Sequence, residues 1–179
     1  EKAVSLVFRF LPLAFQDGTN LLAREKMHNA SCMAGLAFNS AGLGLNHGMA
    51  HAIGAKLHIA HGRINAMLLP HIITFNADLG RIRNGEYAAK KYQRMAKVLD
   101  LPAPSVRLGV TNLLREVERL NRTLKIPASL KEWGAEPSKV KELRGEIVSA
   151  ALADATTATN PRPAAAEHVE ALLNKVMGG

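Results

Sequence analysis

Apolar residues recur at helical spacing along almost all of the 179 residues, and no stretch shows the apolar–polar alternation of a half-buried strand. Hydrophobic residues make up 47% of the sequence but aromatic residues only 4%, so the core has to be built from aliphatic side chains. Such a core favours packed helices over a sheet. We therefore expect one all-α domain over residues 1–179, with about eight helices.

Glycine, proline and turn residues divide this pattern into segments. Pro12 is expected to bend the first helix, Asn20 to cap the second, and Pro70 to kink the fourth. Residues 80–85 are expected to form a loop and residues 156–162 an extended segment, with a short turn near Trp133. The expected helices cover residues 6–13, 21–38, the surroundings of His47, and residues 61–76, 86–99, 102–124, 137–153 and 164–177.

Cysteine content and hydropathy disfavour a secreted or membrane protein. The single cysteine, Cys32, excludes an intrachain disulfide and fits a reducing compartment. It lies among small and apolar residues of an expected helix, which predicts an inert buried thiol. No apolar run reaches the ~18 residues of a membrane span, and the first residues resemble the middle of an amphipathic helix rather than a signal peptide. The chain therefore reads as a cytoplasmic fragment of a longer protein.

The net charge of +8 makes nucleic-acid binding one candidate function. However, the basic residues are interleaved with acidic ones, as in Arg115 and Arg119 beside Glu116 and Glu118, and no aromatic residues accompany them as stacking platforms. Nucleic-acid binding is therefore the less favoured interpretation, and salt-dependent retention on DNA or RNA would test it.

Three histidines are spaced so that their side chains can meet. His47 and His51 are four residues apart, which places them one turn apart on the same face of a helix. His61 follows a weakly helical stretch and precedes Gly62, so the chain can return to the same point. Convergent imidazoles suit zinc or ferrous iron. Spacing alone is more often met by packed or surface histidines, and it leaves open whether His51 is a third ligand.

The residues around these histidines are more specific. Residues 34–76 hold Gly-Leu-Gly-Leu-Asn-His-Gly-Met-Ala-His at positions 42–51, followed by His61-Gly62, and residues 151–163 hold Thr-Asn-Pro-Arg at positions 159–162. Both blocks resemble the iron-containing (group III) alcohol dehydrogenases, most of all the propanol and ethanolamine-pathway enzymes of bacterial microcompartments. The resemblance implies the C-terminal helical domain of the dehydroquinate synthase-like fold. The family's N-terminal dinucleotide-binding domain has no counterpart here, since no glycine-rich loop follows a strand.

The resemblance also implies roles for individual residues. His47 and His61 are implied metal ligands, and His51 is implied to face metal and nicotinamide as a catalytic and cofactor-binding residue that accepts or relays the substrate proton. Phe38 and Thr156 are implied to line the substrate pocket. The Asn160-Pro-Arg run is either a helix-stopping turn or a functional motif. The family's Asp-x-x-x-His motif, which supplies its other metal ligands, is missing, so this chain alone is expected to be inactive.

For the intact enzyme, the resemblance implies reversible hydride transfer between a small primary alcohol and NAD or NADP, with Fe²⁺ or Zn²⁺ as the metal. It implies a homo-oligomer, in the cytoplasm or in a bacterial microcompartment, without a nucleic-acid or membrane partner. Relatives often have proline before the second metal histidine, where this chain has Ala60. The alternative function is a non-catalytic helical module that binds metal or a partner protein.

Overall fold

The computed structural model describes residues 1–80 and 82–178, and the side chains of all of these except 82–86. Over these residues the chain is all-α with no strand, and no helix among them is both long and apolar enough to cross a membrane. These residues form nine α-helices, and the one added to the eight expected is the single-turn α7, at the turn expected near Trp133. The elements are α1 (Lys2–Gln16), α2 (Leu21–Ala41), α3 (Leu45–Leu57), α4 (His61–Ala77), α5 (Ile82–Val98), α6 (Val106–Thr123), α7 (Leu130–Trp133), α8 (Pro137–Ala153), the 3₁₀ helix η1 (Ala155–Thr159) and α9 (Ala166–Met177).

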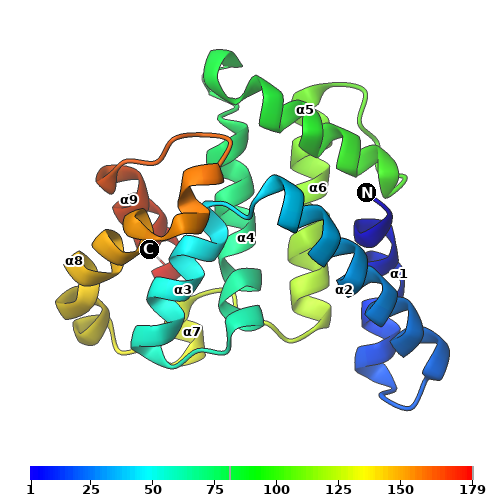
Figure 1. Ribbon diagram of the computed structural model, residues 1–179, viewed down its shortest axis with the longest axis horizontal. Helices are drawn as coiled ribbons and strands as arrows, with labels where there is room; N and C mark the ends of the chain where they lie inside the picture. Colours follow the sequence, from blue (N-terminus) through cyan, green and yellow to red (C-terminus); the bar gives the residue numbers. More distant parts are fainter. Residues whose placement is uncertain (81, 179) are drawn as a thin grey trace.

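Helix α4 takes part in two hydrophobic cores (Figure 1). Its first turns place Ile64 and Leu68 in a core shared with α3, α7, α8 and α9. Its last turns place Ile73 and Ala77 in a second core with α5 and α6. Burying one such aliphatic side chain contributes about 1.5–3 kcal/mol. Helix α4 is therefore held at both ends, which fixes the position of His61 at its start.

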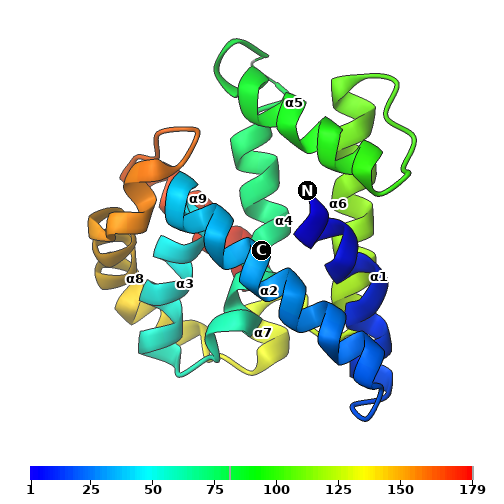
Figure 2. The ribbon, with the colours of Figure 1, turned by 45° about the vertical axis from the view of Figure 1, so that its right-hand side comes forward.

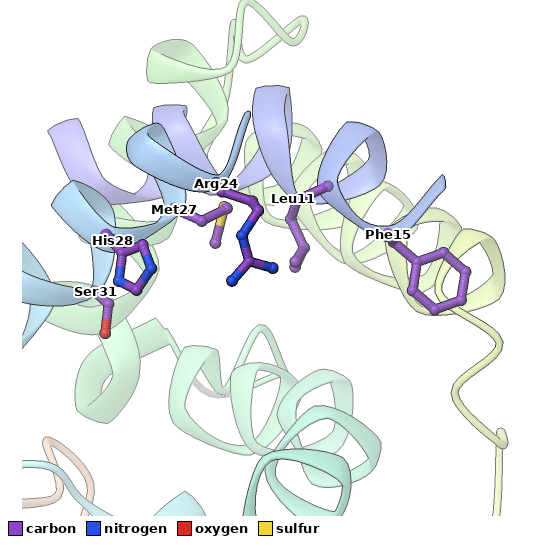
Figure 3. Close-up of a pocket in the computed structure, with 7 residues that line it drawn as sticks. Leu11, Phe15, Arg24, Met27, His28 and Ser31 are labelled. Carbon is purple, nitrogen blue, oxygen red and sulfur yellow. The ribbon is translucent and has the colours of Figure 1, made fainter. Parts of the chain in front are cut away.

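Helices α1 and α2 form a hairpin, which lies at one side of the molecule in Figure 1 and toward the viewer in Figure 2. Helix α1 buries no side chain fully, and α2 buries only Ala23 and Ala30. A shallow cavity of about 400 Å³ lies along the hairpin, where Figure 3 shows Arg24 between Met27 and Leu11. The hairpin therefore shares little core with the rest of the chain.

The expected buried thiol at Cys32 is wrong, because this side chain is exposed. Helix α2 buries a narrow strip of small residues, and a residue two positions beyond Ala30 points about 200° away from that strip. The apolar residues next to Cys32 in the sequence therefore did not indicate that its side chain is buried.

Two boundaries differ from expectation. Residues 155–159 form η1 rather than an extended segment, because the Asp154 carboxylate accepts a hydrogen bond from the Thr156 backbone N–H and starts a turn. Helix α5 begins at Ile82, inside the expected loop of residues 80–85, of which Arg81 lies outside the described residues. A glycine within a helix, as at Gly85, costs only about 1 kcal/mol, which flanking residues can offset.

Glycine is required where α3 meets η1. A Cβ atom at Gly48 would overlap the Thr157 hydroxyl and lie 3.0 Å from the Ala151 carbonyl oxygen. Gly42, which ends α2 with φ +78°, could not carry a Cβ without overlapping Thr159. At Gly42 and Gly48 the backbone therefore packs directly against side chains of η1, at a distance that only glycine permits.

We predict that Gly48→Ala lowers the free energy of unfolding by about 1–3 kcal/mol, because the added methyl group overpacks this contact. Urea denaturation measures the change. The control is Gly35→Ala on α2, where a Cβ meets no atom within 4 Å. That change should stabilise the helix by about 0.5–1 kcal/mol. Equal effects of the two substitutions would contradict the prediction.

Candidate metal centre

Two consecutive helices bring the three histidines together. His47 and His51 lie one turn apart on α3, and His61 is the first residue of α4. Between them His58 takes the left-handed conformation and ends α3, so that α4 begins beside it. The ring centroids are 5.2 Å apart for His47 and His61, 5.1 Å for His51 and His61, and 6.0 Å for His47 and His51.

The surroundings favour neutral imidazole at His47. Burial lowers the pKa of its side chain, His61 and His51 lower it further, and Asp154 partly opposes them. A neutral imidazole with a free lone pair is the form that binds metal. The donor chemistry of this cluster therefore fits a divalent zinc or iron ion.

The cluster is not a complete metal site. Among the described residues, no group of three or more His, Cys, Asp or Glu side chains is arranged to hold a metal ion. Two imidazoles are half of the ligands that a four-coordinate site uses. Beside the cluster lies an open cavity of about 380 Å³, lined by Ala50, His51, Gly54, Ala55, Ile59 and His61. A substrate or a second set of ligands can reach the histidines from this side.

A carboxylate from a distant part of the sequence contacts His51. Its Nδ1 lies 2.8 Å from Asp154 Oδ2, although the two residues are 103 positions apart. Asp154 Oδ1 accepts hydrogen bonds from the Thr156 backbone N–H at 2.8 Å and from the Thr156 hydroxyl at 2.6 Å. These bonds, Thr156 first and His51 after it, lower the pKa of Asp154 to about 2. Asp154 was not among the residues expected at the site, and its only signal in the sequence was its place in the block of residues 151–163.

The Asn160 side chain links three segments. Its Oδ1 accepts a hydrogen bond from the Leu45 backbone N–H at 3.1 Å, at the start of α3. Its Nδ2 donates to Asn76 Oδ1 at 2.8 Å and to the Arg162 carbonyl at 2.6 Å. Asn76, only 3% exposed, also donates to the Tyr92 hydroxyl at 3.3 Å. Asn160 therefore fixes the segment after η1 against both α3 and α4.

Arg162 strengthens the same link. Its guanidinium donates to the Phe75 carbonyl at 2.7 Å, lies over the Phe75 ring at 4.2 Å, and pairs with Asp78 at 3.4 Å. Both Asn160 and Arg162 thus direct their side chains to the last turn of α4. Of the two interpretations left open by the sequence, these contacts favour a structural role for the Asn-Pro-Arg run.

The two predicted pocket residues lie in different surroundings. Phe38 is on α2, 46% exposed, and is not among the residues that line the cavity beside His51 and His61. Thr156 is linked to His51 through Asp154, to which its hydroxyl donates a hydrogen bond. Their role in lining a substrate pocket stays a prediction.

Residues 1–177 match the model of the "Fe-containing alcohol dehydrogenase family, C-terminal". The chain belongs to this family. It is 42% identical over 179 residues to the 1-propanol dehydrogenase PduQ of Salmonella typhimurium, covering 99% of this chain and 47% of that protein. It is 39% identical over 140 residues to an NADPH-dependent butanol dehydrogenase of Clostridium saccharobutylicum, covering 78% of this chain and 34% of that protein.

Solved structures show the same helical arrangement. The alcohol dehydrogenase from Oenococcus oeni superposes with a TM-score of 0.85 at 30% identity, over 98% of this chain and 43% of that one. The iron-containing alcohol dehydrogenase from Thermococcus thioreducens gives 0.85 at 30% identity, over 99% and 43%. The predicted fold, a C-terminal helical domain of this family, is confirmed. The chain spans about half the length of the curated 1-propanol dehydrogenases that it matches.

We predict that Asn160→Ala lowers the free energy of unfolding by about 2–4 kcal/mol, because the Leu45 N–H and the buried Asn76 amide lose their partner. Thermal or urea unfolding measures the loss. The control, Asn29→Ala on the exposed side of α2, should stay within about 0.5 kcal/mol of the unsubstituted protein. A similar small effect at Asn160 would show that the link does not hold α3 and α4 together.

Proposed function

We propose that the protein containing this chain is a metal-dependent alcohol dehydrogenase that interconverts a small primary alcohol and its aldehyde with NAD or NADP. The main support is that His47, His51 and His61 lie together beside an open cavity, in a chain of the iron-containing alcohol dehydrogenase family. The names of its relatives, a 1-propanol dehydrogenase and a butanol dehydrogenase, support a short aliphatic substrate.

His47 and His61 would hold the metal, Fe²⁺ or Zn²⁺, together with ligands from outside this chain. Burial and the neighbouring rings favour neutral His47, so that it is ready to bind without first losing a proton. A bound divalent metal supplies Lewis-acid chemistry to a substrate oxygen, and a nicotinamide supplies the hydride chemistry. Neither half of the site is sufficient by itself, and the isolated chain is expected to be inactive.

His51 would handle the proton of the substrate hydroxyl. Its ring lies at the cavity and stacks near His61, while its Nδ1 is held by Asp154. A neutral imidazole at this position accepts a proton on oxidation of the alcohol and returns it on reduction of the aldehyde. Small residues at the cavity, Ala50 and Gly54, leave room for a compact substrate next to this ring.

The resemblance to the propanol enzymes is confirmed by the match to two 1-propanol dehydrogenases. The homo-oligomer and the setting, in the cytoplasm or in a bacterial microcompartment, stay predictions. Likewise, Phe38 and Thr156 stay candidates for contact with the substrate.

We predict different losses for the two kinds of histidine. His47→Ala should weaken metal binding by at least about 100-fold and remove turnover with it, because one ligand is gone. His51→Gln should keep the metal but lower kcat by about 10²–10⁴-fold, since only the proton carrier is lost. The measurements are metal content by mass spectrometry and NAD(P)H-dependent reduction of propionaldehyde by the full-length gene product, loaded anaerobically.

The control is His28→Ala, an exposed residue of α2 outside the histidine cluster, which should change neither quantity. A protein that binds metal and folds but shows no turnover, in either cofactor, would instead support the non-catalytic metal-binding module. Unchanged metal content in His47→Ala would remove His47 from the ligand set.

A further inference from the structure

We propose that Asp154 and Thr156 form a positioning pair that holds His51 in one tautomer, with the proton on Nδ1 and the lone pair of Nε2 directed to the site. Neither residue was assigned such a role by the sequence. The consequence for catalysis rests on the proposed dehydrogenase function, whereas the tautomer itself is a property of this chain and can be measured separately.

The hydrogen bonds determine which nitrogen carries the proton. An ionised carboxylate can only accept hydrogen bonds, so the His51 nitrogen at 2.8 Å from Asp154 Oδ2 has to be the donor. In a neutral ring with its proton on Nδ1, Nε2 is the acceptor. The ring that lines the cavity therefore offers a base, as proton removal from a hydroxyl requires.

The two carboxylate oxygens have separate partners. Oδ1 is occupied by both donors of Thr156, at 2.8 Å and 2.6 Å, which leaves Oδ2 for His51 alone. Asp154 is also the residue between the end of α8 and the start of η1, so its backbone is fixed on both sides. The Asp154 side chain is 21% exposed, against 43% for His51. The carboxylate is thus the better fixed partner, and the ring follows it.

The chain holds a second copy of the same turn without the histidine. In the exposed turn between α1 and α2, Asp17 Oδ1 accepts from the Thr19 backbone N–H at 2.9 Å and from its hydroxyl at 2.6 Å. An Asp-x-Thr turn therefore forms for local reasons. What distinguishes Asp154 is that its turn packs on α3 and directs Oδ2 to a ring on that helix. Asp17 provides a matched control.

The decisive variant is Asp154→Asn. An asparagine that keeps its oxygen on the two Thr156 donors has to present its NH₂ group to His51. His51 Nδ1 then has to accept, and the proton moves to Nε2, which takes the lone pair away from the site. A change of one atom thus reverses the tautomer with little change in volume.

The test uses the full-length gene product, with ¹⁵N-labelled histidine, in its metal-free form at about pH 8. Long-range ¹H–¹⁵N spectra report the tautomer, and the His51 signal is assigned by its absence in His51→Gln. We expect Nδ1–H in the unsubstituted protein and in Asp17→Asn, and Nε2–H in Asp154→Asn. In the metal-loaded enzyme, Asp154→Asn should lower kcat by about 100-fold or more, with KM and metal content within about two-fold of the unsubstituted values.

Thr156 supplies a milder variant that retains the carboxylate. Thr156→Val removes one of the bonds to Oδ1 and should lower kcat by about 3–10-fold, whereas Thr156→Ser should restore it. If Asp154→Asn does not fold, the two Thr156 variants test the proposal instead, since valine should give a mixture of the two His51 tautomers and serine should not.

An Nε2–H tautomer in the unsubstituted protein, or unchanged Nδ1–H in Asp154→Asn, would overturn the proposal. An Nδ1–H ring in a protein without turnover would sustain the positioning pair and reject the dehydrogenase function.

Discussion

The close approach of α3 to residues 154–162 is the constraint on which the site depends. It is possible because Gly42 and Gly48 have no side chains where Thr159 and Thr157 pack against them. At this distance Asn160 reaches the first backbone N–H of α3, and Asp154 reaches the ring of His51, nearly two turns further along the helix. A separation larger by the width of a methyl group would break both contacts. Gly42 and Gly48 thus allow the contacts that position the histidines.

Three imidazoles can lie this close together because their surroundings disfavour a positive charge on His47 and place a carboxylate beside His51. Protonated rings at centroid distances of 5–6 Å would repel one another, and this repulsion is among the causes that lower the pKa of His47. Asp154 places one negative charge at the side of His51, away from the ring contacts with His61. The result is a set of rings that are suited to bind a cation, and one of them has a defined hydrogen-bond partner.

Much of the fold could be predicted from the sequence, because aliphatic residues at helical spacing, together with glycine and proline, mark helices locally. The convergence of His47, His51 and His61 was also predictable, since it needs only one helical turn and one break in the chain. The His51–Asp154 contact was not, because it joins residues 103 positions apart and depends on how α8 packs on α3. Cys32 was placed wrongly for a related reason: the composition of α2 does not show how little of that helix the rest of the chain covers.

Rigidity is distributed unevenly, and this follows from where side chains are buried. Helix α4 enters two cores, and its last turn is tied to residues 160–162 through Asn76 and the Phe75 carbonyl. Helix α1 buries no side chain fully, so few contacts oppose its local opening. His61 therefore stands on a helix that is anchored in both cores, whereas α1 shares little of either. In the metal site that we propose, this arrangement would hold the imidazoles of His47 and His61 in place for ligands from outside this chain.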